Sequence, residues 1–273
     1  MTLSLNTNVA ASKAALHLAK NQENLNKSLD RLSSGKRITS AADDAGGLAV
    51  AMKMEANVSS LKAGVMNMEN ALSFLQVQDD AMNTAQDIIS RMIELNASTG
   101  DPFYIEGTSD DFDAEIVALK DQLVALEGGA FNGQSLFGGT QLAVSIDGVT
   151  ANNITIKQED LQTALGAAYT ATTMALLNGT ATTAARKTAL DGIMDLVSPL
   201  RGSNAGMQSR IQGSIKSSES QIVGLQGAIG RIMDVDIASE SANLAKQQIL
   251  VQASASMVAQ ANSVNNAALL LLQ

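Results

Sequence analysis

The 273-residue chain contains no cysteine, no tryptophan and a single histidine, His17. Without cysteine there are no disulfides, thiolate metal sites or cysteine nucleophiles, and one histidine cannot form a paired-histidine zinc site. Aromatic residues make up only 3% of the chain and hydrophobic residues 45%, so the core must consist of Leu, Ile, Val, Met and Ala, which favours helix over sheet. The sequence contains no Gly-rich phosphate loop, metal-ligand cluster or nucleophile arrangement. We therefore expect no catalytic, cofactor or metal site and no enzymatic activity.

Charged residues are missing from the C-terminal stretch Gln247–Gln273, which reads QQILVQASASMVAQANSVNNAALLLLQ. Its Gln, Asn and Ser residues interrupt every long apolar run, so the stretch is a poor membrane span. A helix with so little charge is also poorly suited to water and is expected to be surrounded by protein. We interpret it as an assembly element that neighbouring chains order.

Apolar residues recur at heptad spacing at both ends of the chain, which predicts a helix from Asn8 to about Lys36 and another after Asp236. A plain globular helix would explain either stripe alone, but two stripes at opposite ends favour a coiled-coil pair. The residues predicted to form the terminal assembly helices are Leu18, Leu25, Leu29, Leu32, Ile237, Leu244, Val251, Val258, Leu269 and Leu272.

Two further stripes lie inside these ends and predict rod helices. At ~1.5 Å per residue the first helix would be about 75 Å long, too long to bury its face in a compact domain. We interpret its methionines as packing residues rather than a ligand groove. Pro199 predicts a kink or a fresh helix start capped by Ser198. The predicted rod assembly residues are Met54, Leu61, Met68, Leu75, Met82 and Ile89, followed by Ile211, Ile215, Ile222, Leu225 and Ile229.

The middle of the chain differs in composition from the two ends. Residues 101–198 contain 13 acidic and 4 basic residues, which accounts for the whole net charge of −9, so we expect this part to face solvent on an outer surface. Asp147–Gly148 between β-branched runs predicts a β-hairpin. A turn at Phe131–Gly133 and a short helix at about 161–177 are also predicted.

The predicted fold is mainly α, with long antiparallel coiled-coil helical rods from both chain ends and a small β-hairpin segment in the middle. The predicted domains are a terminal pair, residues 1–45 and 234–273, and a rod domain, residues 46–233. Within the rod domain we expect helices at about 46–98, 113–127 and 190–233, the hairpin at about 141–157 and a variable segment at 158–189.

Three motifs resemble the bacterial flagellin family: LDRLSSGKRITSAADDAGGLA at 29–49, FNG at 131–133, and the ending from Asp234 through AKQQILVQASASMVAQAN to LLLLQ. The first and last are specific, and with the rod helices the resemblance covers nearly the whole chain. The chain is similar to a minimal flagellin without large outer domains. It departs from the family at Gly46–Gly47, where Ala-Gly is more frequent, and at Pro199, which lies in a helix that is usually uninterrupted.

The resemblance implies a structural subunit that self-assembles into the flagellar filament used for swimming. It implies that the terminal helices form the filament's inner tube and are disordered in the free subunit. The implied partners are further copies of the chain, an export chaperone, and the filament cap and hook-junction proteins, with neither nucleic acid nor membrane insertion. The N-terminus has neither a basic region nor a continuous apolar region, so we expect export through the flagellar type III channel without a cleaved signal peptide.

The stretch SRMIELNAS at 90–98 resembles the part of the family that binds an animal Toll-like flagellin receptor. The matching residues are Arg91, Glu94 and Leu95, with Glu115 as a neighbour, whereas Ile93 stands where a second Arg is common. An exposed Arg on a helix is often only a solvated residue, and this alternative stays open.

Three other functions agree less well with the sequence. The hook–filament junction protein shares the paired ends, but it tends to carry Asp-Asp-Pro where this chain has Asp43-Asp44-Ala45, which favours flagellin. A secreted protease would need an inserted domain and metal ligands. A pore-forming translocator would need a spanning apolar segment.

Overall fold

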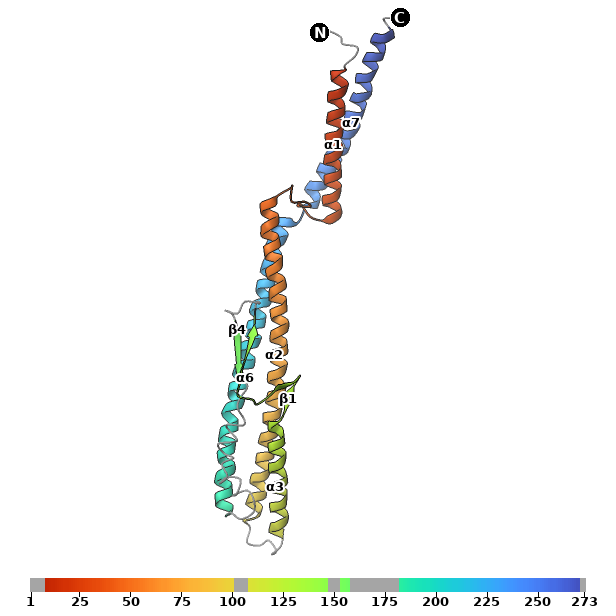
Figure 1. Ribbon diagram of the computed structural model, residues 1–273. Coiled ribbons are helices and arrows are strands. Elements are labelled where there is room, and N and C mark those ends of the chain that lie inside the picture. Colours follow the sequence, from red (N-terminus) through yellow and green to blue (C-terminus); the bar gives the residue numbers. More distant parts are fainter. Residues whose placement is uncertain (1–7, 101–107, 147–152, 158–181, 271–273) are drawn as a thin grey trace. The chain divides into compact units, whose positions relative to one another are not determined.

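The computed structural model describes residues 8–100, 108–146, 153–157 and 182–270. Helices dominate, as predicted, and short strands lie in the middle of the chain (Figure 1). The helices are α1 (Val9–Ser34), α2 (Ala45–Ser98), α3 (Thr108–Glu127), α6 (Thr183–Met233) and α7 (Ile237–Leu270). The strands are β1 (Ala130–Phe131), β2 (Gln134–Ser135), β3 (Gln141–Ser145) and β4 (Asn153–Lys157).

Side-chain caps define the starts of three helices. The side chain of Asn8 accepts a hydrogen bond from the Ala11 amide at 3.0 Å, and Asp44 Oδ1 accepts one from the Gly47 amide at 2.8 Å. Asp236 Oδ1 likewise accepts from the Ala238 amide at 2.9 Å. These oxygens satisfy amides that have no partner within a helix, which explains why the helices begin there. The predicted start of the terminal helix after Asp236 is confirmed.

Internal packing divides the chain into two units. The first contains the described residues up to Ala56 and from Gly224 onward, and in it α1 and α7 lie side by side (Figure 1). The second contains the described residues between Asn57 and Val223. The division falls within α2 and α6, whereas the domain boundaries expected from the sequence lie at the ends of these helices.

The second unit has a continuous apolar core. Met68, Leu75, Met82 and Ile89 line one face of α2, and all four are fully buried. They pack with apolar residues of α3, α6 and β4. Of the other predicted rod residues, Leu61 and Ile211 are buried, and Met54, Ile215, Ile222, Leu225 and Ile229 are partly covered.

Both strand pairs are antiparallel hairpins. β3 pairs with β4 from Gln141↔Lys157 to Ser145↔Asn153, which confirms the predicted hairpin, although its Asp147–Gly148 turn lies outside the described residues. β1 and β2 are joined by Asn132 (φ 48°) and Gly133 (φ 81°), two positive φ angles that suit a tight hairpin turn. The helix predicted at about 161–177 also lies outside the described residues.

Of the two outcomes predicted at Pro199, a kink or a fresh helix start, the fresh start is wrong. α6 runs uninterrupted from Thr183 to Met233, and Ser198 does not cap it, because its hydroxyl donates to the Met194 carbonyl at 2.9 Å. Val197 on one side and Asn204 on the other are buried, so packing along the helix outweighs the hydrogen bond that proline removes.

α3 and α6 begin earlier than predicted, at Thr108 rather than about 113 and at Thr183 rather than about 190. Polar contacts hold the first turn of α6: Arg186 is buried and pairs with Asp113, and the Asn96 side-chain amide donates to the Thr183 carbonyl at 3.0 Å. Apolar periodicity does not report contacts of this kind.

The glycine at position 64 allows the end of β3 to approach α2. A Cβ atom there would lie 1.5 Å from the backbone oxygen of Ile146, which is impossible without moving the strand. Gly206 in α6 provides a contrast, because no atom lies within 4 Å of its would-be Cβ.

We predict opposite effects of alanine at these two positions. Gly64→Ala is expected to lower the free energy of unfolding by about 1–3 kcal/mol through overpacking. Gly206→Ala is expected to raise it by about 0.5–1 kcal/mol through helix propensity. Urea unfolding of both variants followed by circular dichroism measures the change. Equal effects of the two substitutions would show that the hairpin does not need this close approach.

Candidate assembly surface

α1 and α7 meet along a seam of residues spaced alternately three and four apart, as in a coiled coil. Residues between these positions are mostly exposed. In α1 the seam residues are Ala11, Ala14, Leu18, Asn21, Leu25, Ser28 and Leu32; in α7 they are Glu240, Leu244, Gln247, Val251, Ser254, Val258 and Ala261.

The seam is unusually polar at its most covered positions. Among the described side chains of α1 and α7, the buried ones are Ser28, Glu240 and Ser254. Asn21 Nδ2 donates to Ser254 Oγ at 2.7 Å, and Asn8 Nδ2 donates to the Ala261 carbonyl at 2.9 Å. Hydrogen bonds of this kind fix the register of two helices but contribute less stability than apolar contacts.

The predicted terminal residues divide into two groups. Leu18, Leu25 and Leu32 of α1, and Leu244, Val251 and Val258 of α7, lie in the seam and are partly covered. Leu29 lies outside the seam, Ile237 precedes the seam residue Leu244 by one heptad, and both are exposed. The side chain of Leu269 and all of Leu272 lie outside what the structure describes.

Large apolar side chains are exposed on both helices of the pair. We call the exposed set Val9, Leu16, Leu29, Ile237, Ile249, Leu250 and Met257 the outer apolar face. Leu16 is 72% exposed and Ile249 67%. Of the fourteen exposed large apolar residues in the described part of the chain, nine belong to the first unit, although it is the smaller one. Concentrated exposure of this kind is typical of an interaction surface.

The segments next to the terminal pair are held by backbone hydrogen bonds. The Arg37 amide donates to the Met233 carbonyl at 2.6 Å, and the Val235 amide donates to the Gly35 carbonyl at 3.0 Å. Ile38 is buried and packs with Met233 and Ala51. These contacts couple the chain just after α1 to the chain just before α7.

The motif GKRITSAADDAGG forms a turn around Asp43. The carboxylate accepts hydrogen bonds from the amides and hydroxyls of Thr39 and Ser40 at 3.1–3.3 Å. These bonds, led by the one from the Thr39 amide, lower the pKa of Asp43. Because the folded-state pKa is lowered, the stabilising contribution is present at neutral pH and is lost as the pH falls through that pKa.

The double glycine of the motif has a steric explanation. At Gly47 a Cβ would lie 2.5 Å from Asp44 Oδ2, on the residue that caps α2, whereas at Gly46 the nearest atom is 3.7 Å away. Alanine therefore fits at position 46 but not at 47. The chain differs from the family's Ala-Gly pattern at position 46, where either alanine or glycine fits.

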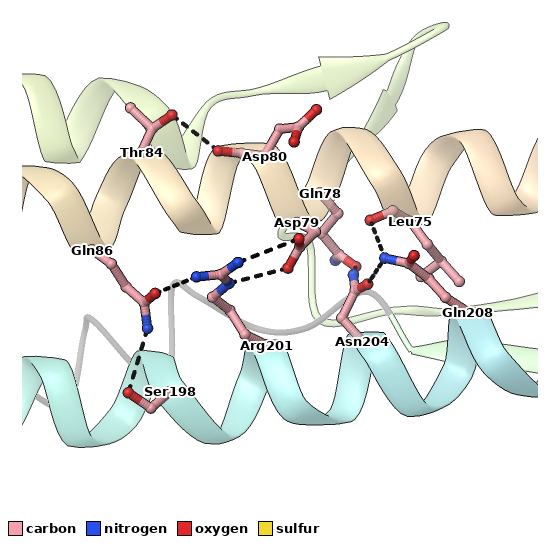
Figure 2. Close-up of polar contacts among 10 residues, drawn as sticks. All are labelled: Leu75, Gln78, Asp79, Asp80, Thr84, Gln86, Ser198, Arg201, Asn204 and Gln208. Carbon is pink, nitrogen blue, oxygen red and sulfur yellow. Dashed lines mark hydrogen bonds and ion pairs between the residues drawn. The ribbon is translucent and has the colours of Figure 1, made fainter.

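A buried polar cluster joins α2 to α6 in the second unit (Figure 2). Gln208 Nε2 donates to Asn204 Oδ1 at 2.6 Å, and Asn204 Nδ2 donates to Gln78 Oε1 at 2.6 Å. Gln78 Nε2 in turn donates to the Leu136 carbonyl at 2.7 Å. Beside this chain Arg201 pairs with Asp79 at 3.1 Å and also binds Gln86.

This cluster was not predicted from the sequence, although amide residues within the apolar stripes indicate it. Asn204 stands seven residues from both Val197 and Ile211, and Gln78 lies between Leu75 and Met82 at coiled-coil spacing. An amide within an apolar stripe often sets helix register.

The candidate receptor residues lie at the contact between α2 and α3. Arg91 Nε and a terminal nitrogen donate to Glu115 Oε1 at 3.1 and 2.9 Å, and Glu94 lies 3.5 Å from the guanidinium. The Glu115 hydrogen bond and charge raise the pKa of Arg91. All three side chains are substantially exposed, whereas Leu95 is 2% exposed and packs in the core. Leu95 is therefore not available to a partner in this conformation.

An uncharged cleft of about 380 Å³ lies over α2 beside the hairpins, lined by residues such as Asn70, Phe74, Phe131 and Val144. Within residues 8–100, 108–146, 153–157 and 182–270 there is no group of three potential metal ligands. Over the same described residues no helix has the length and apolar content to cross a bilayer.

Comparison with known proteins gives a consistent result. The N-terminal helical region of bacterial flagellin matches residues 5–142, and its C-terminal helical region matches residues 188–272. The chain is 31% identical to the flagellin of Halalkalibacterium halodurans, over 98% of this chain and 99% of that protein. It is 29% identical to the Bacillus subtilis flagellin over 94% and 96% of the two chains. The flagellar filament 33 kDa core protein of Treponema phagedenis is 28% identical over 98% and 99%.

The polar seam generates a prediction about the terminal pair. Asn21→Leu would place an apolar side chain against α7 without stranding Ser254, whose hydroxyl also donates to the Leu250 carbonyl at 2.7 Å. Amides of α1 and α7 in the free subunit should then exchange with solvent on the order of tenfold more slowly. Hydrogen-exchange mass spectrometry measures this, with Gln22→Leu, one position outside the seam, as the matched control. Similar exchange rates in both variants would mean that the polar seam residues do not limit the stability of the α1–α7 pair.

Proposed function

The chain belongs to the bacterial flagellin family, and from that membership we propose that the outer apolar face of α1 and α7 is the surface through which its copies assemble. The protein is a structural subunit of the flagellar filament, which lies outside the cell, and its copies polymerise with one another. The observation that carries the proposal is the concentration of exposed large apolar side chains on the terminal pair, whose most buried positions are the polar residues Ser28, Glu240 and Ser254.

The energetics favour ordering on assembly. Burying one Leu, Ile, Val or Met side chain contributes roughly 1.5–3 kcal/mol, and the seven residues of the outer face gain this only from other copies. Within one chain the leucines and valines of the seam are only partly covered, while ordering each residue opposes folding by about 1–2 kcal/mol. Residues 1–45 and 234–273 therefore form the inner-tube domain, which orders as copies pack.

The second unit supports a different role for the rod domain, residues 46–233. Its buried methionine and leucine face, its polar cluster and its hairpins give it a core that needs no partner. The rod is thus the part that is folded before assembly, and it carries the filament's next shell. Filaments of such subunits serve swimming motility.

The same exposed face supports the proposed export route. Before assembly, the apolar residues of α7 would promote unwanted association, so the cell has to cover them. An export chaperone holding the C-terminal segment meets this need, and the subunit leaves through the flagellar type III channel. The filament cap and the hook-junction proteins are the other proposed partners of the subunit.

A receptor site is proposed at Arg91, Glu94 and Glu115. The three charged side chains lie together on an exposed surface of α2 and α3, at the positions that resemble the family's receptor-binding stretch. Arg91 is already held by Glu115, so it is presented in a fixed orientation. Leu95 contributes only by packing beneath them.

Polymerisation tests the outer apolar face. Ile249→Asp places a charge on this face, where the side chain has no role inside the subunit, and should raise the critical concentration for filament growth at least about tenfold. Helix content of the subunit should stay the same. Sedimentation and electron microscopy give the readout, and Ile249→Leu, which keeps an apolar side chain, should assemble normally. Unchanged filament growth by Ile249→Asp would remove this face from the interface.

Receptor binding tests the Arg91 cluster. If the site engages the animal Toll-like flagellin receptor, Arg91→Ala should weaken binding of the free subunit about 30-fold, as expected for a central Arg anchor. Arg210→Ala, which removes another exposed Arg of the same unit, should not. Surface plasmon resonance with the receptor ectodomain compares them. Equal binding by Arg91→Ala and wild type would place the interface elsewhere, and no binding by wild type would refute recognition.

A further inference from the structure

The methionines of this chain differ sharply in exposure. The sequence contains 12, of which Met68, Met82 and Met92 are fully buried. Met257 is 63% exposed, Met66 is 64% exposed and Met52 is 60% exposed. Since oxidation of a thioether follows its access to solvent, an oxidant reaching the free subunit meets these three first among the methionines that the structure describes.

The surroundings of Met257 set it apart from Met66. On α7, Met257 follows the exposed Leu250 by one heptad, with Ala253 between them, inside the outer apolar face. On α2, the helical neighbours of Met66 include Lys62, Glu69 and Asn70, so its thioether lies alone on a polar surface. A scattered apolar side chain of that kind needs no partner, whereas Met257 stands with Leu250 and Ala253 in a short apolar stripe.

We propose that Met257 is an oxidation-sensitive modification site, whose conversion to methionine sulfoxide blocks assembly of the subunit. The inference rests on the proposed role of the outer apolar face. It adds a modification site and its consequence: the same residue is open to oxidants in the free subunit and covered in the filament.

The chemistry is a two-electron oxygen transfer from a peroxide. The sulfur lone pair of Met257 attacks one peroxide oxygen, the O–O bond breaks as the S–O bond forms, and water leaves after proton transfer. Sulfur is oxidised and hydrogen peroxide is reduced. The flexible apolar thioether becomes a polar, chiral sulfoxide.

A sulfoxide at this position conflicts with an apolar contact. Its oxygen is a strong hydrogen-bond acceptor, and burying it without a donor is unfavourable. No charged side chain occurs from Gln247 to the last residue, so this part of α7 offers no cation to compensate it. The oxidised subunit keeps its fold, because Met257 has no buried role within the chain.

The experiment treats the full-length subunit with dilute hydrogen peroxide, removes the excess with catalase, and maps sulfoxide by peptide mass spectrometry. Treated wild type should show a critical concentration for polymerisation about tenfold or more above that of untreated protein. Treated Met257→Leu should assemble like untreated protein even though Met52 and Met66 are oxidised. Met66→Leu, the matched control, should remain as sensitive as wild type.

Two further measurements complete the test. Methionine sulfoxide reductases acting on both sulfoxide epimers should restore assembly of treated wild type. In preformed filaments, Met257 should oxidise about tenfold more slowly than in free subunits. Normal assembly of wild type fully oxidised at Met257, or equal sensitivity of Met257→Leu, would overturn the inference while leaving the proposed function intact. Equally fast oxidation of Met257 in filaments and subunits would overturn both, since α7 would then not be covered.

Discussion

Burial of apolar surface cannot be completed within one copy of this chain, and the rest of the architecture follows from that constraint. In the terminal pair the seam contains Asn21, Ser28 and Ser254, whereas residues such as Leu16 and Ile249 face outward. A pair built this way gains its main stabilisation by mass action, from the concentration of further copies. The second unit has the opposite character, because its own side chains bury the whole methionine and leucine face of α2.

The register of the paired helices is specified by polar side chains, at positions where apolar side chains would stabilise the fold more. The chain of amides from Gln208 through Asn204 to Gln78 is satisfied only when α2, α6 and the segment after β2 are at one relative level. A slip of one heptad would leave buried amides without partners, which is strongly unfavourable. In the terminal pair, Asn21 and Ser254 define the register in the same way at lower burial.

Much of this fold could be predicted from the sequence, because heptad spacing directly reflects which face of a helix is covered. The long helices, the β3–β4 hairpin and the cap at Asp236 follow from local patterns. That α6 continues through Pro199 could not be predicted, since the burial of Val197 and Asn204 that keeps α6 continuous is a tertiary effect. The seam amides and the burial of Leu95 were missed for a similar reason. A helical pattern gives the spacing of covered residues, but the neighbouring elements decide which face of the helix is covered.

The core of the second unit also has mechanical consequences. Met68, Met82 and Met92 occupy successive levels along α2, and an unbranched thioether changes rotamer with little loss of packing. The amide cluster at Gln78 and Asn204 lies between two of these levels and cannot shift without breaking hydrogen bonds. The unit therefore resists sliding of its helices at the amide cluster and deforms more easily in the methionine layers on either side of it. A small force along the helix axes would change the rotamers of the methionine layers. Sliding of α2 against α6 would begin only when the force broke the hydrogen bonds of the amide cluster.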